Sequence, residues 1–360
     1  MSQSKPVLDP TTARVKLDLS PSVNHQYLAD HLKPALAYNG GDVKSWQKKL
    51  RKVFAQLTGF ASFPKPADRI RLKVRKLASW RNEYGTIEKL AFAAEPKSDI
   101  LAFLCIPDSA QPPYQTFICV QGHSTGMHHS VAVEREANGK PFKVEGDRDF
   151  GLLCMQRGIV ALCIEQRAFG ERREQMMAHP GPHGCHDATM HALMLGRTLT
   201  AERVFDVDRG IDYLATRGDI DMKRIGIMGN SGGGTTSLNA AALLDRIAFA
   251  MPSCYFCTFR DSIMSIYHCM DNYVPGILNY AEMHDIMGLF APKPVVIVAG
   301  EQDEIFPIGA TRKAFKKLKT IYASAGAPWN CKLVVGPEGH RFYADQAWPE
   351  MMKFIRASHR

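Results

Sequence analysis

The stretch RIGIMGNSGGGTTSLNAAALLD (residues 224–245) decides the fold, because it joins a short apolar run to a segment of small residues typical of a helix. Between the two lies GNSGG (229–233), in which glycines flank a serine. A G-x-S-x-G pattern between a strand and a helix indicates a sharp turn that presents the serine at the strand's end. The amide groups of the helix that follows favour negative charge near this serine. We therefore take Ser231 as a candidate nucleophile.

Apolar runs and helical stretches alternate on both sides of this segment. The run PVVIVAG is apolar at successive positions, as a strand buried on both faces requires. The alternation predicts an α/β fold, a doubly wound and mostly parallel sheet with helices on both faces. The expected strands are 116–122, 158–166, 224–229, 247–253, 294–300 and 331–336, and the expected helices lie near 187–217, 234–244 and 309–325.

The chain before this alternation is expected to add two further parts. The runs 69–80, 86–96 and 100–107 are separated by turn residues and predict antiparallel edge strands. Helices are expected over about 25–38 and 43–58. We thus predict an N-terminal helical extension (1–65) packed on the core of the main domain (66–360).

Charge is unevenly distributed, since the net charge of +9 is concentrated in residues 42–82. A basic region of this kind can be a footprint for nucleic acid. In WQKKLRKVFAQL, however, the apolar residues fall at helical spacing with Lys and Arg between them. We therefore interpret the basic residues as a solvated helix face and expect no nucleic-acid partner.

Targeting signals and cysteine content bear on the compartment. The chain has no apolar run of 18 residues, so we expect no membrane span. The first 20 residues show no apolar stretch behind their charges and do not resemble a secretory signal. Nine cysteines, an odd number, argue against a disulfide framework. These observations predict a cytoplasmic protein.

A candidate acid and a candidate base follow the last two predicted strands. Asp303 lies three residues after the end of PVVIVAG, with Glu301 and Glu304 as alternatives for the acid. His340 follows CKLVVG in the loop PEGHRF. The carboxyl ends of parallel strands meet at one edge of a sheet, where active sites form. The order Ser231, Asp303, His340 therefore predicts a triad in which the acid orients the imidazole and the imidazole activates the serine.

A second match to the serine pattern, GHSTG (122–126), follows the predicted strand 116–122. An irregular loop follows Ser124, whereas a helix follows Ser231, so we assign the nucleophile to Ser231. In this architecture an oxyanion hole takes one backbone N–H from the residue after the nucleophile and one from a loop after an early strand. We expect the backbone N–H groups of Gly232 and His123 to fill these roles.

With these residues in place, the chain resembles the α/β-hydrolase superfamily over residues 98–355. More narrowly it is similar to bacterial esterases described as acetyl xylan esterase-like or dienelactone hydrolase-related. The segments that carry the likeness are VQGHSTG, GIVALCIEQRAFGERRE, GIMGNSGGGT, AGEQDEIFP and PEGHRF. The resemblance implies the same triad. The chain differs from many relatives at Gln121. It also has a serine nucleophile, whereas true dienelactone hydrolases have a cysteine.

The predicted function is hydrolysis of small-molecule carboxylic esters with a short acyl group, such as acetyl, through an acyl-enzyme on Ser231. An acyl-peptidase or aminopeptidase-like amide hydrolase is the alternative within the same chemistry. A non-catalytic binding protein on the same fold is the alternative from another class. Substrate contacts are expected from Ser124, His268 and Tyr273. The sequence leaves a homo-oligomer open.

No cofactor and no metal are expected. One His-rich stretch is a candidate metal site by composition but not by spacing. HPGPHGCHDATMHA (179–192) holds imidazoles and a thiol, but their spacing matches no established metal motif. CYFC (254–257) resembles a redox pair, yet it follows an apolar strand and is expected to pack in the core.

Overall fold

The computed structural model describes residues 8–123, 125–135, 139–174 and 184–358. Its strands form a sheet of nine in the order β1-β2-β3-β5-β4-β6-β7-β8-β9. β1, β2, β3 and β5 pair antiparallel, and the pairs from β5 through β4 to β9 are parallel. The strands are β1 (Arg75–Asn82), β2 (Gly85–Glu95), β3 (Ser98–Pro107), β4 (Tyr114–Val120), β5 (Val160–Ile164), β6 (Ile220–Asn230), β7 (Phe249–Ser253), β8 (Val295–Gly300) and β9 (Cys331–Gly336).

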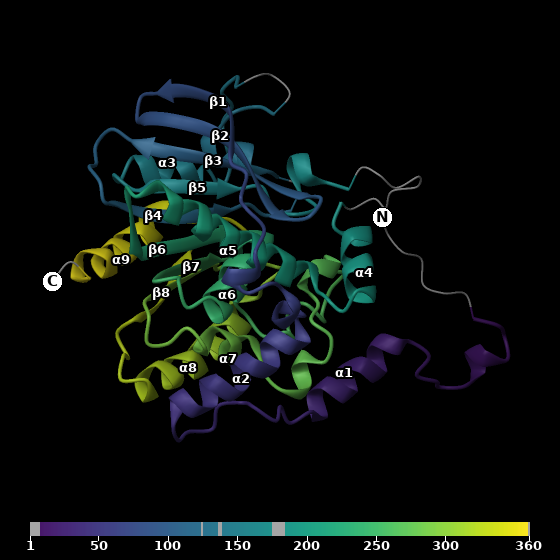
Figure 1. Cartoon of the computed structure of the whole chain (residues 1–360). Coiled ribbons are helices and arrows are strands. Elements are labelled where there is room, and N and C mark those ends of the chain that lie inside the picture. The colour runs from purple at the N-terminus through teal and green to yellow at the C-terminus, as the bar shows by residue number, and fades with distance from the viewer. Residues whose placement is uncertain (1–7, 124, 136–138, 175–183, 359–360) are drawn as a thin grey trace.

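Helices cover both faces of this sheet, which confirms the predicted layering (Figure 1). The helices are α1 (Pro21–His31), α2 (Val43–Leu57), α3 (Phe150–Met155), α4 (His186–Met194), α5 (Leu199–Arg217), α6 (Gly232–Leu243), α7 (Met283–Gly288), α8 (Ile308–Ser324) and α9 (Ala344–Ala357).

Alternate residues of the central strands point into two separate cores. In β4, Ile118 and Val120 pack in the core formed with α2, α5, α6, α7 and α8. Phe117 and Cys119 pack in the core formed with α3 and α9. Successive side chains of a strand point to opposite faces, so a strand covered on both sides must be apolar at every position. This is the physical reason for the uninterrupted apolar runs in the sequence.

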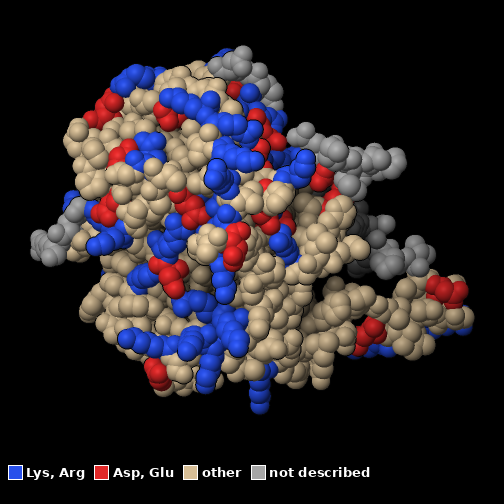
Figure 2. Space-filling model, in the orientation of Figure 1, with Lys and Arg blue, Asp and Glu red and all other residues tan. Residues whose placement is uncertain are grey.

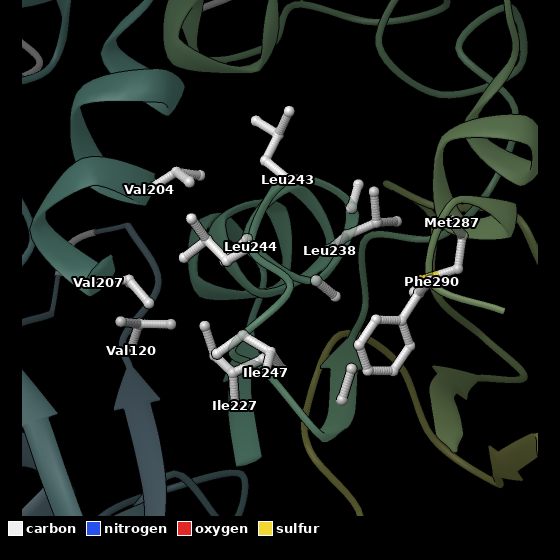
Figure 3. Close-up of a cluster of buried hydrophobic side chains, with 14 of the residues drawn as sticks. Val120, Val204, Val207, Ile227, Leu238, Leu243, Leu244, Ile247, Met287 and Phe290 are labelled. Atoms are coloured by element: carbon white, nitrogen blue, oxygen red, sulfur yellow. The ribbon is translucent and has the colours of Figure 1, made fainter. Parts of the chain in front are cut away.

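The helix that follows Ser231 is buried on all sides. Every residue of α6 is buried, and its small residues let neighbouring elements approach closely. Figure 3 shows Leu238, Leu243 and Leu244 between Val204 of α5 and Met287 of α7. Burying such side chains stabilises the fold by about 1.5–3 kcal/mol each. The helix that carries the candidate site is therefore held by the larger of the two cores.

Several predicted boundaries differ from the structure for local reasons. The helix predicted over 187–217 is two helices, α4 and α5, separated by Gly196 with a φ of 74°. The first helix ends at His31 rather than near residue 38, since Pro34 lies beyond its end. β1 begins at Arg75, not at residue 69. The short helix α3 and the C-terminal helix α9 were not predicted.

The N-terminal segment contacts the main domain through α2. Leu50 and Phe54 are buried in the same core as α6. The Gln47 side-chain amide donates hydrogen bonds to the carbonyls of Gly288 and Ala291. By contrast, α1 projects from the body of the molecule (Figure 1). The limits 1–65 and 66–360 stay a prediction.

Lysines of α2 are exposed, as its helical spacing indicated. Lys and Arg side chains gather over α2 on the face in Figure 2, and elsewhere on this face acidic residues lie among them. Within the described residues, no helix has the length and apolar character needed to cross a membrane.

Candidate active site

Ser231 occupies a strained turn between β6 and α6. Its φ of 58° and ψ of −122° are unusual for a residue with a side chain, and such strain gathers at functional sites. Close packing forces the turn. A Cβ atom on Gly233 would lie 2.0 Å from the carbonyl oxygen of Val120, and one on Gly229 would lie 2.4 Å from the same oxygen. The turn predicted from the sequence is thus present, and the flanking glycines are the residues that permit it.

Asp303 and His340 are brought together from the ends of β8 and β9. His340 Nδ1 donates to Asp303 Oδ2 at 2.8 Å, and the Asp303 side chain is only 1% exposed. The backbone N–H groups of Ile305 and Phe306 donate to the other carboxylate oxygen. Burial alone would raise the pKa of Asp303, but the His340 hydrogen bond and charge, with these amides, lower it below its usual value. The carboxylate is therefore ionised at neutral pH.

The second ring nitrogen of His340 is free to act. His340 Nε2 is buried and has no hydrogen-bond partner within the described part of the chain. The ring stacks on Phe306, with the two ring centroids 5.8 Å apart and an interplanar angle of 19°. Because Nδ1 donates to the carboxylate, Nε2 is the acceptor in the neutral ring. This is the tautomer that a general base requires.

The end of β7 links the Ser231 turn to the His340 loop. The Ser253 carbonyl accepts the Ser231 backbone N–H at 2.9 Å. The Ser253 hydroxyl lies 3.5 Å from the carbonyl oxygen of Arg341, the residue after His340. Cys254 also donates to that carbonyl, at 3.1 Å. The carboxyl ends of β6, β7, β8 and β9 therefore meet at one place.

Cys254 is buried, as predicted for the CYFC segment, but it lies beside the acid and the base. Its sulfur, a His340 ring nitrogen and an Asp303 oxygen lie within 4.8 Å of one another. Burial and the nearby Asp303 charge raise the pKa of this thiol well above its ordinary value, so it stays protonated. Apart from its position after a strand, nothing in the sequence indicates that Cys254 is a neighbour of the acid and the base.

The loop after β4 passes over the turn that carries Ser231. A Cβ atom on Gly122 would lie 2.8 Å from the Asn230 carbonyl oxygen and 3.0 Å from Ser231 Cβ, so only glycine permits this approach. A Cβ atom on Gly232 would lie 2.9 Å from His123 Nδ1. The two residues predicted to supply oxyanion-hole amides, Gly232 and His123, are therefore in contact with each other.

The His123 side chain belongs to a buried ionic group that sequence reasoning missed. Its Nε2 lies 3.0 Å from both carboxylate oxygens of Asp271, which also pairs with buried Arg203. Burial would lower the pKa of His123, but the Asp271 charge and hydrogen bond raise it to about 9. Burial would raise the pKa of Asp271, but Arg203 and His123 lower it far below its usual range. Only the fold brings these distant positions together.

The three predicted substrate contacts have different outcomes. His268 lies near the base, since it packs on Phe306 with ring centroids 5.5 Å apart, and Phe306 in turn stacks on His340. The hydroxyl of Tyr273 donates to the Ile263 carbonyl at 3.1 Å, and the residue is 41% exposed. Ser124 lies outside the described residues. All three roles stay predictions.

A cavity of about 650 Å³ opens beside this site. His123, Phe169, Cys185 and Cys269 are among the residues that line it. Cys185 comes from the His-rich stretch, of which His179 and His183 fall outside the described residues. The donor atoms of His123, Cys185, Cys269 and Asp271 lie within 4.8 Å of one another, as do those of His128, Glu165 and Glu171.

Comparison with known proteins agrees with this architecture. A family model described as "Prolyl oligopeptidase family" matches residues 194–356. YtaP of Bacillus subtilis (strain 168), described as a hydrolase, is 24% identical over 276 residues, which is 76% of this chain and 88% of that protein.

Two solved structures give the same result. One is a Bacteroides fragilis NCTC 9343 protein described as an acetyl xylan esterase, with a TM-score of 0.73 and 17% identity, covering 92% of this chain and 84% of that one. The other is a glucuronoyl esterase from Solibacter usitatus, with a TM-score of 0.61 and 15% identity, covering 91% and 99%. Likeness at this level of identity shows the fold, which is that of the α/β-hydrolases, as the resemblance implied.

Proposed function

We propose that this chain, which has the α/β-hydrolase fold, is a serine hydrolase of carboxylic esters. The observation that carries the proposal is the Asp303–His340 hydrogen bond of 2.8 Å at the sheet edge where β6 ends in the Ser231 turn. A buried carboxylate, an imidazole with a free Nε2 and a serine on a strained turn are the parts of a triad. No cofactor is needed for this reaction.

The chemistry proceeds in two halves. His340 Nε2 takes the proton of the Ser231 hydroxyl as its oxygen attacks the ester carbonyl, and then returns the proton to the departing alcohol. Water attacks the resulting acyl-enzyme with the same base, releasing the acid and restoring Ser231. Asp303 holds the ring in one tautomer and stabilises the imidazolium that forms in each half.

The backbone N–H groups of Gly232 and His123 are proposed to hold the negative oxygen of the tetrahedral intermediate. Gly232 is the first residue of α6, where backbone N–H groups have no acceptor within the helix. The Gly122–Ser231 contact brings the His123 loop to the same place. Losing one such donor costs about 3 kcal/mol of transition-state stabilisation.

The substrate is proposed to be a small ester with a short acyl group such as acetyl. Support comes from the described activities of structural neighbours, which include an acetyl xylan esterase and a glucuronoyl esterase. The prolyl oligopeptidase match keeps amide hydrolysis as the second candidate. Nine free cysteines support the predicted cytoplasmic location.

The test compares wild type with Ser231→Ala on p-nitrophenyl acetate and on an acyl-amino-acid p-nitroanilide. We expect Ser231→Ala to retain the fold and to lose ester turnover. A fluorophosphonate probe should label wild type at position 231, as mapped by peptide mass spectrometry, and should leave the variant unlabelled. Ser237→Ala, a buried serine of the same helix, is the matched control and should keep both activity and label.

Retained ester turnover in folded Ser231→Ala would refute the assignment of the nucleophile. Absence of label from every serine of wild type would favour the non-catalytic binding protein. Turnover of the anilide in place of the ester would favour the amide hydrolase.

A further inference from the structure

Four side chains of the types that can ligate a metal converge beside the cavity from three segments that are far apart in the sequence. His123 follows β4, Cys185 precedes α4, and Cys269 and Asp271 lie between β7 and α7. We name these four residues the thiol cluster. Each offers one donor atom, and these atoms lie within 4.8 Å of one another. We propose that the thiol cluster is a zinc site.

The spacing of the donor atoms suits a tetrahedral ion. Zinc bonds of about 2.0 Å to nitrogen or oxygen and about 2.3 Å to sulfur place tetrahedral donors roughly 3.3–3.8 Å apart. The four donor atoms all lie within 4.8 Å of one another, and side-chain rotation can bring them into this range. His123 Nε2 and Asp271 already lie 3.0 Å apart, bridged by a proton that an ion can replace.

The donor set selects zinc among common cations. Two cysteines, one histidine and one aspartate combine soft sulfur ligands with an imidazole, whereas magnesium and calcium prefer oxygen alone. Cysteine binds zinc as a thiolate. Zinc binding would therefore displace the protons of Cys185 and Cys269.

The residues around the thiol cluster complete the site. Arg203 pairs with Asp271, and both side chains are 1% exposed. Two thiolates and a carboxylate around a divalent ion leave one excess negative charge, which the Arg203 guanidinium neutralises. Outer hydrogen bonds of this kind orient ligands in zinc proteins. The cavity that His123, Cys185 and Cys269 line gives the ion a route from solvent.

Four protein ligands make a closed site, which is the arrangement of structural zinc. Bound zinc would join the loop after β4, the start of α4 and the β7–α7 connection. It would thereby fix His123, whose backbone N–H is a proposed oxyanion donor. The inference goes beyond ester hydrolysis and does not depend on it. The sequence predicted no metal, since 84 positions separate Cys185 from Cys269 and no short motif marks them.

Metal content of the full chain is the direct test. The protein is produced in zinc-supplemented medium, passed over a desalting column and analysed by elemental mass spectrometry. We expect about one zinc per chain for a structural site of this kind. Chelator-stripped protein is then titrated with zinc in competition with a chromophoric chelator. Cobalt in place of zinc should give a thiolate-to-cobalt charge-transfer band.

Single substitutions locate the ion. Cys185→Ser and Cys269→Ser should each weaken zinc binding at least about a hundredfold and remove the cobalt band, while Asp271→Asn should weaken it about tenfold or more. Cys331→Ser, a buried thiol of β9 outside the thiol cluster, is the control and should bind as wild type does. If a variant does not fold, the number of zinc ions per wild-type chain and the cobalt spectrum of wild type decide whether the proposal holds.

Three results would overturn the proposal. The first is wild type with far less than one zinc per chain and no thiolate-to-cobalt band. The second is unchanged zinc affinity in both cysteine variants. The third is a Cys185–Cys269 disulfide as the stable form under reducing conditions. None of these readouts uses ester turnover, so failure here is distinguishable from failure of the proposed hydrolase activity.

Discussion

Replacing Asp303 by Asn tests the proposed base most directly, because it changes one charge and little volume. Asp303 accepts the His340 Nδ1 hydrogen and is almost fully buried. In the transition state His340 becomes an imidazolium, and the carboxylate stabilises that charge. An amide keeps the shape of the side chain but removes the negative charge.

The size of the effect follows from the geometry. Unit charges about 4 Å apart attract by about 4 kcal/mol at an effective dielectric constant of about 20. Since about 1.4 kcal/mol corresponds to a factor of ten in rate, this loss predicts a kcat lower by about a thousandfold. Substrate binding does not involve the carboxylate, so KM should change little.

The assay is steady-state hydrolysis of p-nitrophenyl acetate at pH 8, with thermal unfolding followed in parallel by circular dichroism. Glu304→Gln is the matched control, because Glu304 is exposed and next in sequence. It should keep kcat within about twofold, as expected for an exposed side chain outside the site. A folded Asp303→Asn protein with more than a tenth of wild-type kcat would refute the reasoning, and loss of activity in Glu304→Gln would move the acid to Glu304.

Two further predictions concern stability. Leu50→Ala in α2 removes a fully buried side chain and should lower the free energy of unfolding in urea by about 2–5 kcal/mol. The control Lys49→Ala, at an exposed position of α2, should change that free energy by less than about 0.5 kcal/mol. An effect of Leu50→Ala as small as that of Lys49→Ala would mean that α2 contributes nothing to the fold. Burial lowers the pKa of His128 from 6.5 to about 4. The unfolded chain therefore binds more protons between these values, and stability should fall as pH decreases through this window. His128→Gln should lose less unfolding free energy than wild type between pH 7 and pH 5, and the same loss in both would contradict the assignment.

Local pattern was enough for the fold class and for the parts of the candidate site that lie at strand ends. β8 and β9 must be apolar throughout because helices cover both faces, so their ends, and hence Asp303 and His340, could be located in the sequence. The serine turn was visible because the close approach of the Val120 carbonyl oxygen leaves no room for a Cβ atom at positions 229 and 233, so both are glycine. In each case the pattern itself occupies a few consecutive residues, although the contacts that require it come from distant parts of the chain.

The sequence did not predict the boundaries of some helices or the remaining residues of the site. Gly196 divides a helical pattern that looked continuous in the sequence. No strand follows α9, so the alternation of strands and helices did not mark this helix. Asp271 and Arg203 are ordinary charged residues in the sequence, 68 positions apart, yet they form a buried pair beneath His123. Cys254 looked like core packing, and only the fold reveals that it lies beside Asp303 and His340.

The sequence by itself determined the α/β layering, the order of the candidate triad and the turn at Ser231, because these depend on periodicity and on glycine at close approach. The tertiary structure alone decided which distant side chains share a site, including the thiol cluster. The physical reason is that ionic and metal-binding groups act over a few ångströms in space, whatever their separation along the chain.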